Sequence, residues 1–214
     1  MGPLDGHDRV EPQPEAVPDG GRRVRWWHYP AALLIAVAVA LLLRAFVFQA
    51  SWVPTASMHP TLLRGDFIII NRLSFLAGEP ERGDVIVFHR DGNDYVKRVA
   101  AVPGESFRFQ DGHLWVEGER IDERAYIAPG AWGHTRGHEL YGEELHRVPP
   151  ERYLVLGDNR LFSRDSRFFG LVDRGEIIGS AFLIYLSVDL GELEKAGLNW
   201  WSAPWHLRLD RILD

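Results

Sequence analysis

A chain of 214 residues is long enough for one domain with a substantial core and too short for two large domains. Hydrophobic residues make up 46% of the chain, which excludes disorder throughout, and a net charge of −6 gives no overall basic field that would attract nucleic acid. The sequence contains no cysteine, which excludes disulfides, thiolate nucleophiles and cysteine-bound metals.

Residues 1–25 are predicted to form a flexible tail. They are rich in Pro, Gly, Asp and Glu and carry few large apolar side chains, so they cannot bury enough surface to offset the entropy of ordering. Arg22, Arg23 and Arg25 close this segment.

Residues 26–48 are predicted to form a transmembrane helix. Trp26, Trp27 and Tyr29 suit a membrane interface, and the apolar run 31–43 follows them. A helix from Arg25 to Arg44 would be about 28 Å long at ~1.5 Å per residue, close to the ~30 Å of bilayer hydrocarbon. The arginines before the run place the N-terminus in the cytoplasm and everything after the helix outside it. A buried helix of a soluble protein and a cleaved signal peptide are the alternatives.

A serine lies in a short loop directly after this helix, between Pro54 and Pro60. Proline limits the backbone shapes of such a loop. A stiff loop can present the Ser57 hydroxyl together with backbone N–H groups, as an oxyanion site requires.

Residues 49–190 are predicted to form a β-rich domain. Short β-branched and aromatic runs alternate with turn formers, and Asp111-Gly112 predicts a two-residue hairpin. Residues 129–150 lack periodicity and are expected to be an irregular insertion. The predicted strands are 67–71, 85–89, 95–101, 106–109, 113–116, 153–156 and 181–188.

Lys97 lies inside one of these predicted strands. Alternation places Tyr95, Lys97 and Val99 on one face and Val96 and Arg98 on the other. Apolar neighbours disfavour the ammonium form, which would allow this lysine to accept a proton near neutral pH.

Two further segments contain polar or aromatic clusters. Residues 157–170 (GDNRLFSRDSRFFG) combine hydroxyls, acids and arginines between strands. The C-terminal segment 191–214 mixes tryptophan, leucine and basic residues, which suits packing on the domain and a membrane-interfacial position equally.

Together these segments resemble the bacterial type I signal peptidases (leader peptidases). The order and spacing of the family's sequence boxes agree from about Ala31 to Asp189. The matching runs are 57–62 (SMHPTL), 65–68 (GDFI), 82–88 (RGDVIVF), 95–99 (YVKRV) with Pro103-Gly104, and 157–170.

The resemblance implies a mainly β, signal-peptidase-like catalytic domain preceded by one N-terminal transmembrane helix. It implies a serine endopeptidase that removes signal peptides after Ala-X-Ala segments through an acyl-enzyme, without cofactor or metal. Preprotein signal peptides, the lipid bilayer and the secretion translocon would be its partners, and the bacterial plasma membrane its location.

Carried over by position, the resemblance implies a role for each residue of the site. Ser57 would be the nucleophile and Lys97 the general base, with Thr55 and the Ser57 N–H forming the oxyanion hole. Ser163 would hydrogen-bond Lys97. Supporting residues would be Asp158, Asp165 and Arg167, and the substrate-binding residues Val53, Pro54, Met58, Leu62, Tyr95 and Val96. Leu161-Phe162 departs from the family, which has a polar pair there.

Other functions remain open from the sequence. A specialised maturation protease of a conjugation or pilus system would share these boxes, and a membrane-anchored scaffold could keep the fold and only bind peptides. A self-cleaving Ser-Lys repressor should carry a DNA-binding domain in place of the apolar helix. His89 or His113 could serve a Ser-His hydrolase, although the resemblance favours the lysine type. His134 and His138 have metal-like spacing without a third ligand.

Overall fold

The computed structural model describes residues 28–76, 78–127, 130–135, 140–188 and 205–206. The predicted tail 1–25, Trp26, Trp27 and most of the C-terminal segment 191–214 lie outside these residues. The chain separates into two compact units, residues 1–39 and 40–214.

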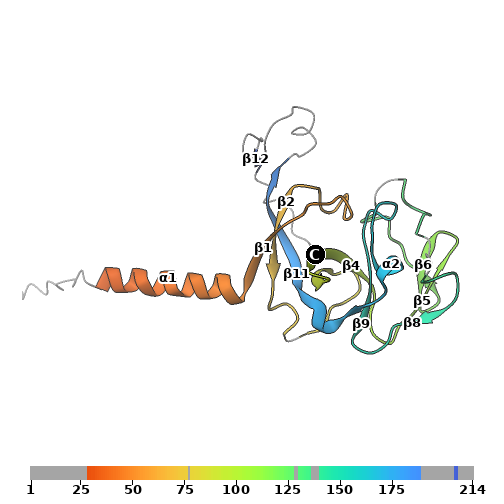
Figure 1. Cartoon of the computed structure of the whole chain (residues 1–214), viewed down its shortest axis with the longest axis horizontal. Coiled ribbons are helices and arrows are strands. Elements are labelled where there is room, and N and C mark those ends of the chain that lie inside the picture. Colours follow the sequence, from red (N-terminus) through yellow and green to blue (C-terminus); the bar gives the residue numbers. More distant parts are fainter. Residues whose placement is uncertain (1–27, 77, 128–129, 136–139, 189–204, 207–214) are drawn as a thin grey trace, which may run out of the picture. The chain divides into compact units, whose positions relative to one another are not determined.

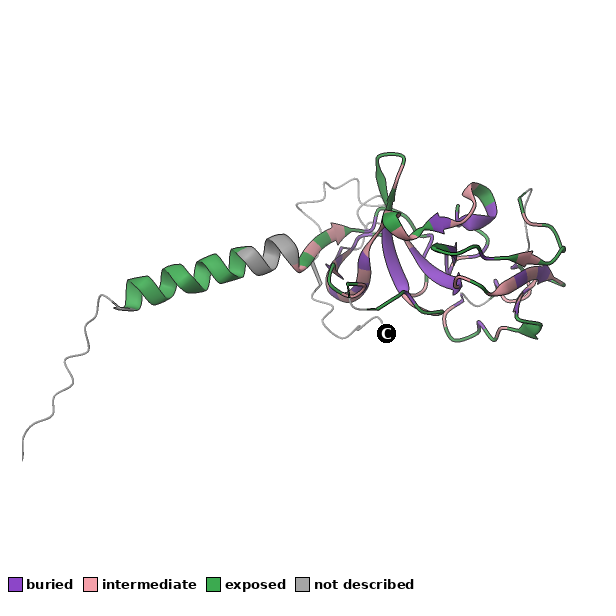
Figure 2. Ribbon diagram, turned by 90° about the horizontal axis from the view of Figure 1, so that it is seen from below, coloured by how far each residue is buried: buried purple, intermediate pink, exposed green. Residues whose placement is uncertain are grey.

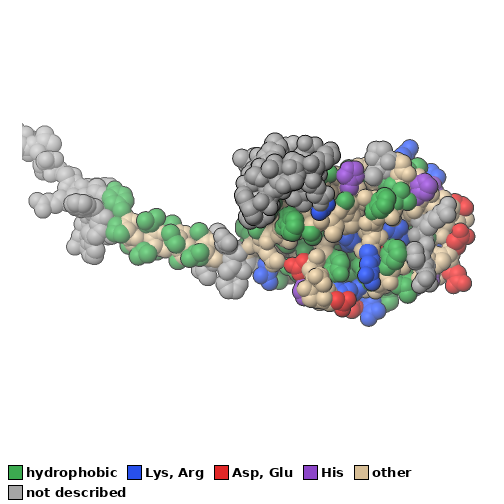
Figure 3. All heavy atoms as spheres, turned by 45° about the horizontal axis from the view of Figure 1, so that its top comes forward, with side chains coloured by type: hydrophobic (Ala, Val, Ile, Leu, Met, Phe, Trp, Pro, Cys, Tyr) green, Lys and Arg blue, Asp and Glu red, His purple; other side chains and the backbone are tan. Residues whose placement is uncertain are grey.

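Helix α1 spans His28–Phe46. Every side chain described in it, from Tyr29 to Leu41, is exposed (Figure 2), and Figure 3 shows apolar side chains along the helix. No helix in the described part of the chain is both long and apolar enough to qualify as a membrane span. The helix ends two residues earlier than predicted because Phe48 begins strand β1 and pairs with Asn71.

The larger sheet has eight strands in the order β1-β2-β11-β3-β4-β9-β10, with β12 paired to β11 (Figure 1). All its pairs are antiparallel. Its strands are β1 (Phe48–Trp52), β2 (Asp66–Asn71), β3 (Val85–Arg90), β4 (Asn93–Ala101), β9 (Arg152–Leu156), β10 (Val172–Asp173), β11 (Ile177–Val188) and β12 (Trp205–His206).

The smaller sheet has four strands in the order β7-β6-β5-β8. Strand β5 (Ser106–Gln110) pairs with β6 (His113–Val116) across the predicted hairpin, where Asp111 and Gly112 have φ of 52° and 75°. Positive φ at both central residues is the requirement of a type I′ turn, so the Asp-Gly prediction is confirmed. Strands β7 (Glu119–Arg120) and β8 (His146–Arg147) flank this pair.

The prediction of a mainly β protein is confirmed, since each predicted strand is present with small boundary shifts. The strands that sequence reasoning missed are short or irregular in pattern. Strand β8 lies within the predicted irregular insertion, where residues 136–139 are outside the described range. Strand β1 follows the apolar helix directly, and its sequence FQASW contains no signal that marks the boundary between helix and strand. Also missed were helix α2 (Ser166–Phe169) and the 3-10 turn η1 (Arg174–Glu176).

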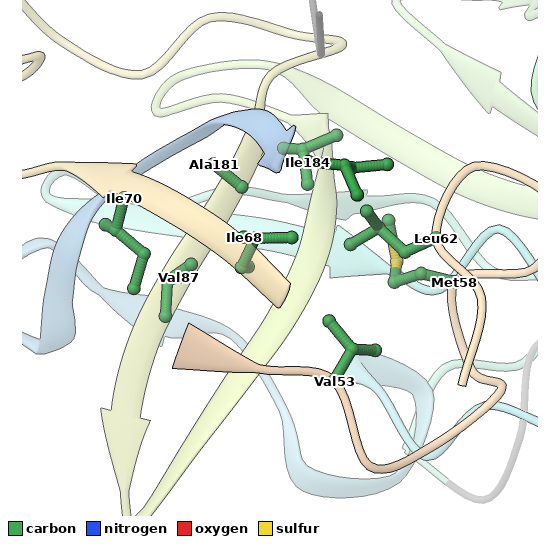
Figure 4. Close-up of a cluster of buried hydrophobic side chains, with 9 residues drawn as sticks. Val53, Met58, Leu62, Ile68, Ile70, Val87, Ala181 and Ile184 are labelled. Atoms are coloured by element: carbon green, nitrogen blue, oxygen red, sulfur yellow. The ribbon is translucent and has the colours of Figure 1, made fainter. Parts of the chain in front are cut away.

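Buried residues concentrate on the central strands of the larger sheet (Figure 2). One cluster joins Val53, Met58 and Leu62, from the loop after β1, to Ile68 of β2 and Ile184 of β11 (Figure 4). A second, which includes Ile86, Phe88 and Val99, fills another part of the interior. Tyr95 packs on the second cluster and Val96 on the first, as the predicted strand alternation requires. The first cluster fixes the loop that carries Ser57.

Candidate active site

Ser57 lies in the loop between β1 and β2, and the core holds both sides of this loop. Met58 and Leu62 are buried at 1% and 0% exposure, and the Leu62 N–H donates to Met58 O at 3.0 Å. Figure 4 shows both side chains directed toward the core residues of β2 and β11. A loop packed in this way gives the buried Ser57 a fixed position in the groove without a helix or strand around it.

Lys97 comes from strand β4, and its Nζ lies 2.8 Å from Ser57 Oγ. The same amine donates to Val96 O at 2.9 Å, and the residue is only 3% exposed. Burial lowers the pKa of Lys97 to about 8, against the opposing charges of Asp165 and Asp158. An amine with this pKa can take up a serine proton close to neutral pH.

Thr55 is exposed beside the serine, with its Oγ1 3.3 Å from Ser57 Oγ. A rotatable hydroxyl at this position can donate to an oxygen bound close to Ser57. Two such donors, the Thr55 hydroxyl and the Ser57 N–H, would meet the geometric need of an oxyanion hole.

The segment 157–170 contacts the serine loop through its backbone and through Asn159. The Asn159 N–H donates to Ser57 O at 3.0 Å, and its Nδ2 donates to Ala56 O at 3.1 Å. A methyl group on Gly157 would lie 2.1 Å from Ser163 Oγ and 2.5 Å from Ser57 O. Only glycine therefore allows this close approach of the two loops.

Asp158 connects this segment to β4 and to the serine loop. Arg98 donates to both carboxylate oxygens, at 2.9 and 2.7 Å, and Thr61 donates to one of them. The Arg98 and Asp158 side chains are 9% and 0% exposed. Such a bidentate ion pair fixes the orientation of the two side chains relative to each other, in addition to pairing their charges. Sequence reasoning did not assign Arg98, Thr61 or Asn159 to the site.

Asp165 and Arg167 form a second buried pair inside the same segment. Arg167 Nε and Nη2 each donate at 2.8 Å to the two oxygens of Asp165, which also accepts from Gly157 N at 3.0 Å. Asp165 further caps helix α2, where it accepts from Arg167 N. The pair thus braces Gly157, the residue packed against Ser57 O.

A third buried pair, between Arg160 and Glu123, was missed by sequence reasoning. Both side chains are 1% exposed, and Thr135 contacts both of them. The pattern offered no signal for it, because Glu123 lies far away in sequence in an irregular segment.

The predicted hydrogen bond from Ser163 to Lys97 is not formed in the structure. Ser163 Oγ is buried and has no hydrogen-bond partner among the described residues. Ser163 packs closely on Gly157, which places Ser163 near the Ser57 backbone. This packing does not direct the Ser163 hydroxyl toward the Lys97 amine.

A groove of about 340 Å³ contains both Ser57 and Lys97. Of the predicted substrate-binding residues, five line it: Val53, Pro54, Met58, Tyr95 and Val96. Leu62 does not, because its side chain is fully buried in the core cluster (Figure 4). Groove residues outside the prediction are Ser51, Trp52, Asn93, Asp94, Phe162 and Arg164.

Within the described residues, no group of three His, Asp or Glu side chains could hold a metal ion. Of the histidine pair with metal-like spacing, His134 is described and His138 lies outside the described residues.

Comparisons with known proteins show the family of the chain. The profile of the family described as signal peptidase, peptidase S26, matches residues 26–186. A signal peptidase I from Bacillus caldolyticus is 40% identical over 173 residues, covering 77% of this chain and 90% of that protein. A probable signal peptidase I-2 from Synechocystis sp. is 35% identical over 171 residues, covering 76% of this chain and 74% of that protein.

A crystal structure of a signal peptidase I from Enterococcus faecalis V583 aligns with 48% of this chain and 96% of its own, at 29% identity and a TM-score of 0.39. The sequence matches alone are sufficient, and the chain belongs to the signal peptidase family, peptidase S26.

Proposed function

We propose that this protein is a membrane-anchored serine endopeptidase that removes signal peptides from exported preproteins by cutting after Ala-X-Ala segments. The observation that carries the proposal is the 2.8 Å distance between Ser57 Oγ and the buried Nζ of Lys97, whose pKa is about 8. The names of the relatives, signal peptidase I, support the substrate class.

Acylation begins with the neutral Lys97 amine, roughly one-tenth of the population at pH 7 for a pKa of about 8. The amine takes the Ser57 proton while Oγ bonds to the scissile carbonyl carbon. The Thr55 hydroxyl and the Ser57 N–H donate to the resulting oxyanion. Lys97 then gives its proton to the departing amine as the C–N bond breaks, which leaves the signal peptide esterified to Ser57.

Deacylation reuses the same amine. Neutral Lys97 takes a proton from a water molecule, the hydroxide attacks the ester, and Ser57 Oγ recovers the proton as it leaves. Ser163, which forms no hydrogen bond to the amine, would act on the site through its packing against Gly157, beside Ser57 O. Asp158, Asp165 and Arg167 keep the 157–170 segment in place through the ion pairs described above.

The substrate would bind as an added strand. Among the described strands, β1 lies at one edge of the larger sheet, and β4 pairs with β9 only from Arg98 onward. Residues 93–97 of β4 therefore have backbone groups open to the groove, opposite the chain at Trp52–Thr55. A peptide between these two edges can form main-chain hydrogen bonds, and shallow pockets there exclude large side chains.

Residues 26–48 would anchor the enzyme in the plasma membrane, with the tail 1–25 in the cytoplasm and residues 49–190 outside. The exposure of every described side chain from Tyr29 to Leu41, nearly all of them apolar, supports this anchor. Exported chains leave the secretion translocon at the same membrane surface, so a functional link to the translocon follows.

The test is cleavage of a preprotein by the purified full-length chain in detergent, with the mature N-terminus identified by sequencing. Ser57→Ala and Lys97→Ala should each abolish cleavage, whereas Ser74→Ala, in the loop after β2, should cleave normally. Cleavage at the wild-type rate by Lys97→Ala would remove the proposed base.

Topology has a separate test, which the absence of native cysteine makes simple. A single cysteine at the exposed Leu145 should react with an impermeant thiol probe from the extracytoplasmic side. Reaction from the cytoplasmic side alone would overturn the proposed orientation.

A further inference from the structure

The groove has a wall that comes from neither β1 nor β4. Phe162 and Arg164, from the loop between β9 and α2, line the same groove as Ser57 and Lys97. Phe162 is 79% exposed, and Arg164 is exposed beside it. These side chains stand where a bound peptide would pass.

Arg164 differs from the other arginines around this segment. Arg98, Arg160 and Arg167 are buried and each forms an ion pair with a carboxylate. Arg164 has no ion pair among the described residues. Within the described ranges, no carboxylate competes with a ligand charge for its guanidinium.

The other ionisable side chains that line the groove form no ion pair with Arg164 in the described part of the chain. Asp94 already contacts His89 Nδ1 at 2.7 Å, and Lys97 contributes no negative charge in either form. Asp94 also lies three residues before Lys97 on β4, about 10 Å along the strand. The groove is therefore lined by two cationic side chains, Arg164 and protonated Lys97, and by one carboxylate, Asp94.

The loop holds Arg164 close to the nucleophile. Its neighbour Ser163 packs against Gly157, beside Ser57 O, and Phe162 N donates to Asn159 O at 3.0 Å. Asn159 in turn donates to Ser57 O and Ala56 O. Because Arg164 and Ser57 line the same groove of about 340 Å³, we expect a substrate residue that meets Arg164 to lie close to the scissile bond.

We propose that Arg164 is a specificity-determining residue that favours an acidic substrate side chain within two residues of the scissile bond. The inference rests on the proposed function and adds a charge preference to the selection of small residues. A new ion pair at a partly exposed site strengthens binding modestly, and salt weakens it.

The test uses internally quenched Ala-X-Ala peptides with Glu or Gln at one of three positions: the residue X before the final Ala, or the first or second residue after the bond. At low salt the wild-type enzyme should show a kcat/KM ratio of Glu to Gln of about two to five at one or more of these positions, as expected for one exposed ion pair. In 0.5 M NaCl the ratio should approach one.

Variants identify the source of the preference. Arg164→Gln should bring the ratio to about one, and Arg164→Glu should favour Lys over Gln at the same position. The control Arg152→Gln, which removes an exposed arginine outside the groove, should keep the wild-type ratio.

The outcomes separate the two proposals. If the peptides are cut but the ratio is one at all three positions, or if Arg164→Gln keeps the preference, the role of Arg164 is wrong and the peptidase function stands. If neither the peptides nor a preprotein are cut by the wild-type enzyme, the proposed function fails and the inference fails with it.

Discussion

Replacing Lys97 with methionine should change how protein stability depends on pH. Burial lowers the pKa of Lys97 from its ordinary 10.5 to about 8. Between these values the folded chain has released the proton and the unfolded chain still holds it, so the free energy of unfolding rises with pH. At about 1.4 kcal/mol per pKa unit, the rise contributed by this amine is roughly 3 kcal/mol.

The variant lacks the amine and so lacks this rise. The difference in unfolding free energy, wild type minus Lys97→Met, should be constant below about pH 7.5 and should increase by roughly 3 kcal/mol by pH 10.5. Loss of the hydrogen bonds from Nζ to Ser57 and Val96 shifts this difference by the same amount at every pH, because the amine can form hydrogen bonds in both protonation states. Raised tyrosine pKa values, such as that of Tyr126 at about 12, affect both proteins and cancel.

The assay is guanidinium denaturation of the full-length chain in a non-ionic detergent, followed by far-UV circular dichroism at several pH values. Ser57→Ala is the matched control, since it removes the hydroxyl but keeps the buried amine, and its pH-dependent rise should persist. Parallel curves for wild type and Lys97→Met would show that the folded amine titrates normally. That result would refute the physical basis of the proposed general base.

Three further predictions concern catalysis and the packing of the site. The kcat/KM for an Ala-X-Ala peptide should rise with pH to a plateau with a midpoint near 8, because the neutral form of Lys97 is the active base; a rate independent of pH from 6 to 9 would contradict this. Thr55→Val should lower kcat about 100-fold with little change in KM, if its hydroxyl donates mainly to the oxyanion in the transition state; an unchanged kcat would remove it from the oxyanion hole. Gly157→Ala should lower the unfolding free energy by about 1–3 kcal/mol and greatly reduce activity, because the added methyl would lie 2.1 Å from Ser163 Oγ and 2.5 Å from Ser57 O. Gly175→Ala is its control, with no atom within 4 Å of the added methyl, and equal losses in both variants would refute the packing argument.

Local features of the chain determined much of the fold. Alternation of β-branched residues predicted the strands, and Asp111-Gly112 predicted a turn whose two positive φ angles the structure contains. The boundary at Phe48 was wrong because the apolar residues at the end of the helix continue to Phe48, the first residue of the strand, and only its pairing with Asn71 separates the two elements.

The order of the motifs identified Ser57 and Lys97 as candidate catalytic residues. Neither composition nor sequence spacing predicts the distance between their side chains. Their 2.8 Å approach depends on the burial of Met58 and Leu62 and on the register of β4 in the sheet. Tertiary packing also decided that Leu62 belongs to the core, that Ser163 makes no bond to the amine, and that Phe162 and Arg164 line the groove. The sequence by itself thus determined which functional groups are present and which strands carry them. Their distances, burial and lowered pKa came only from the fold, because these properties depend on segments that are far apart in the chain.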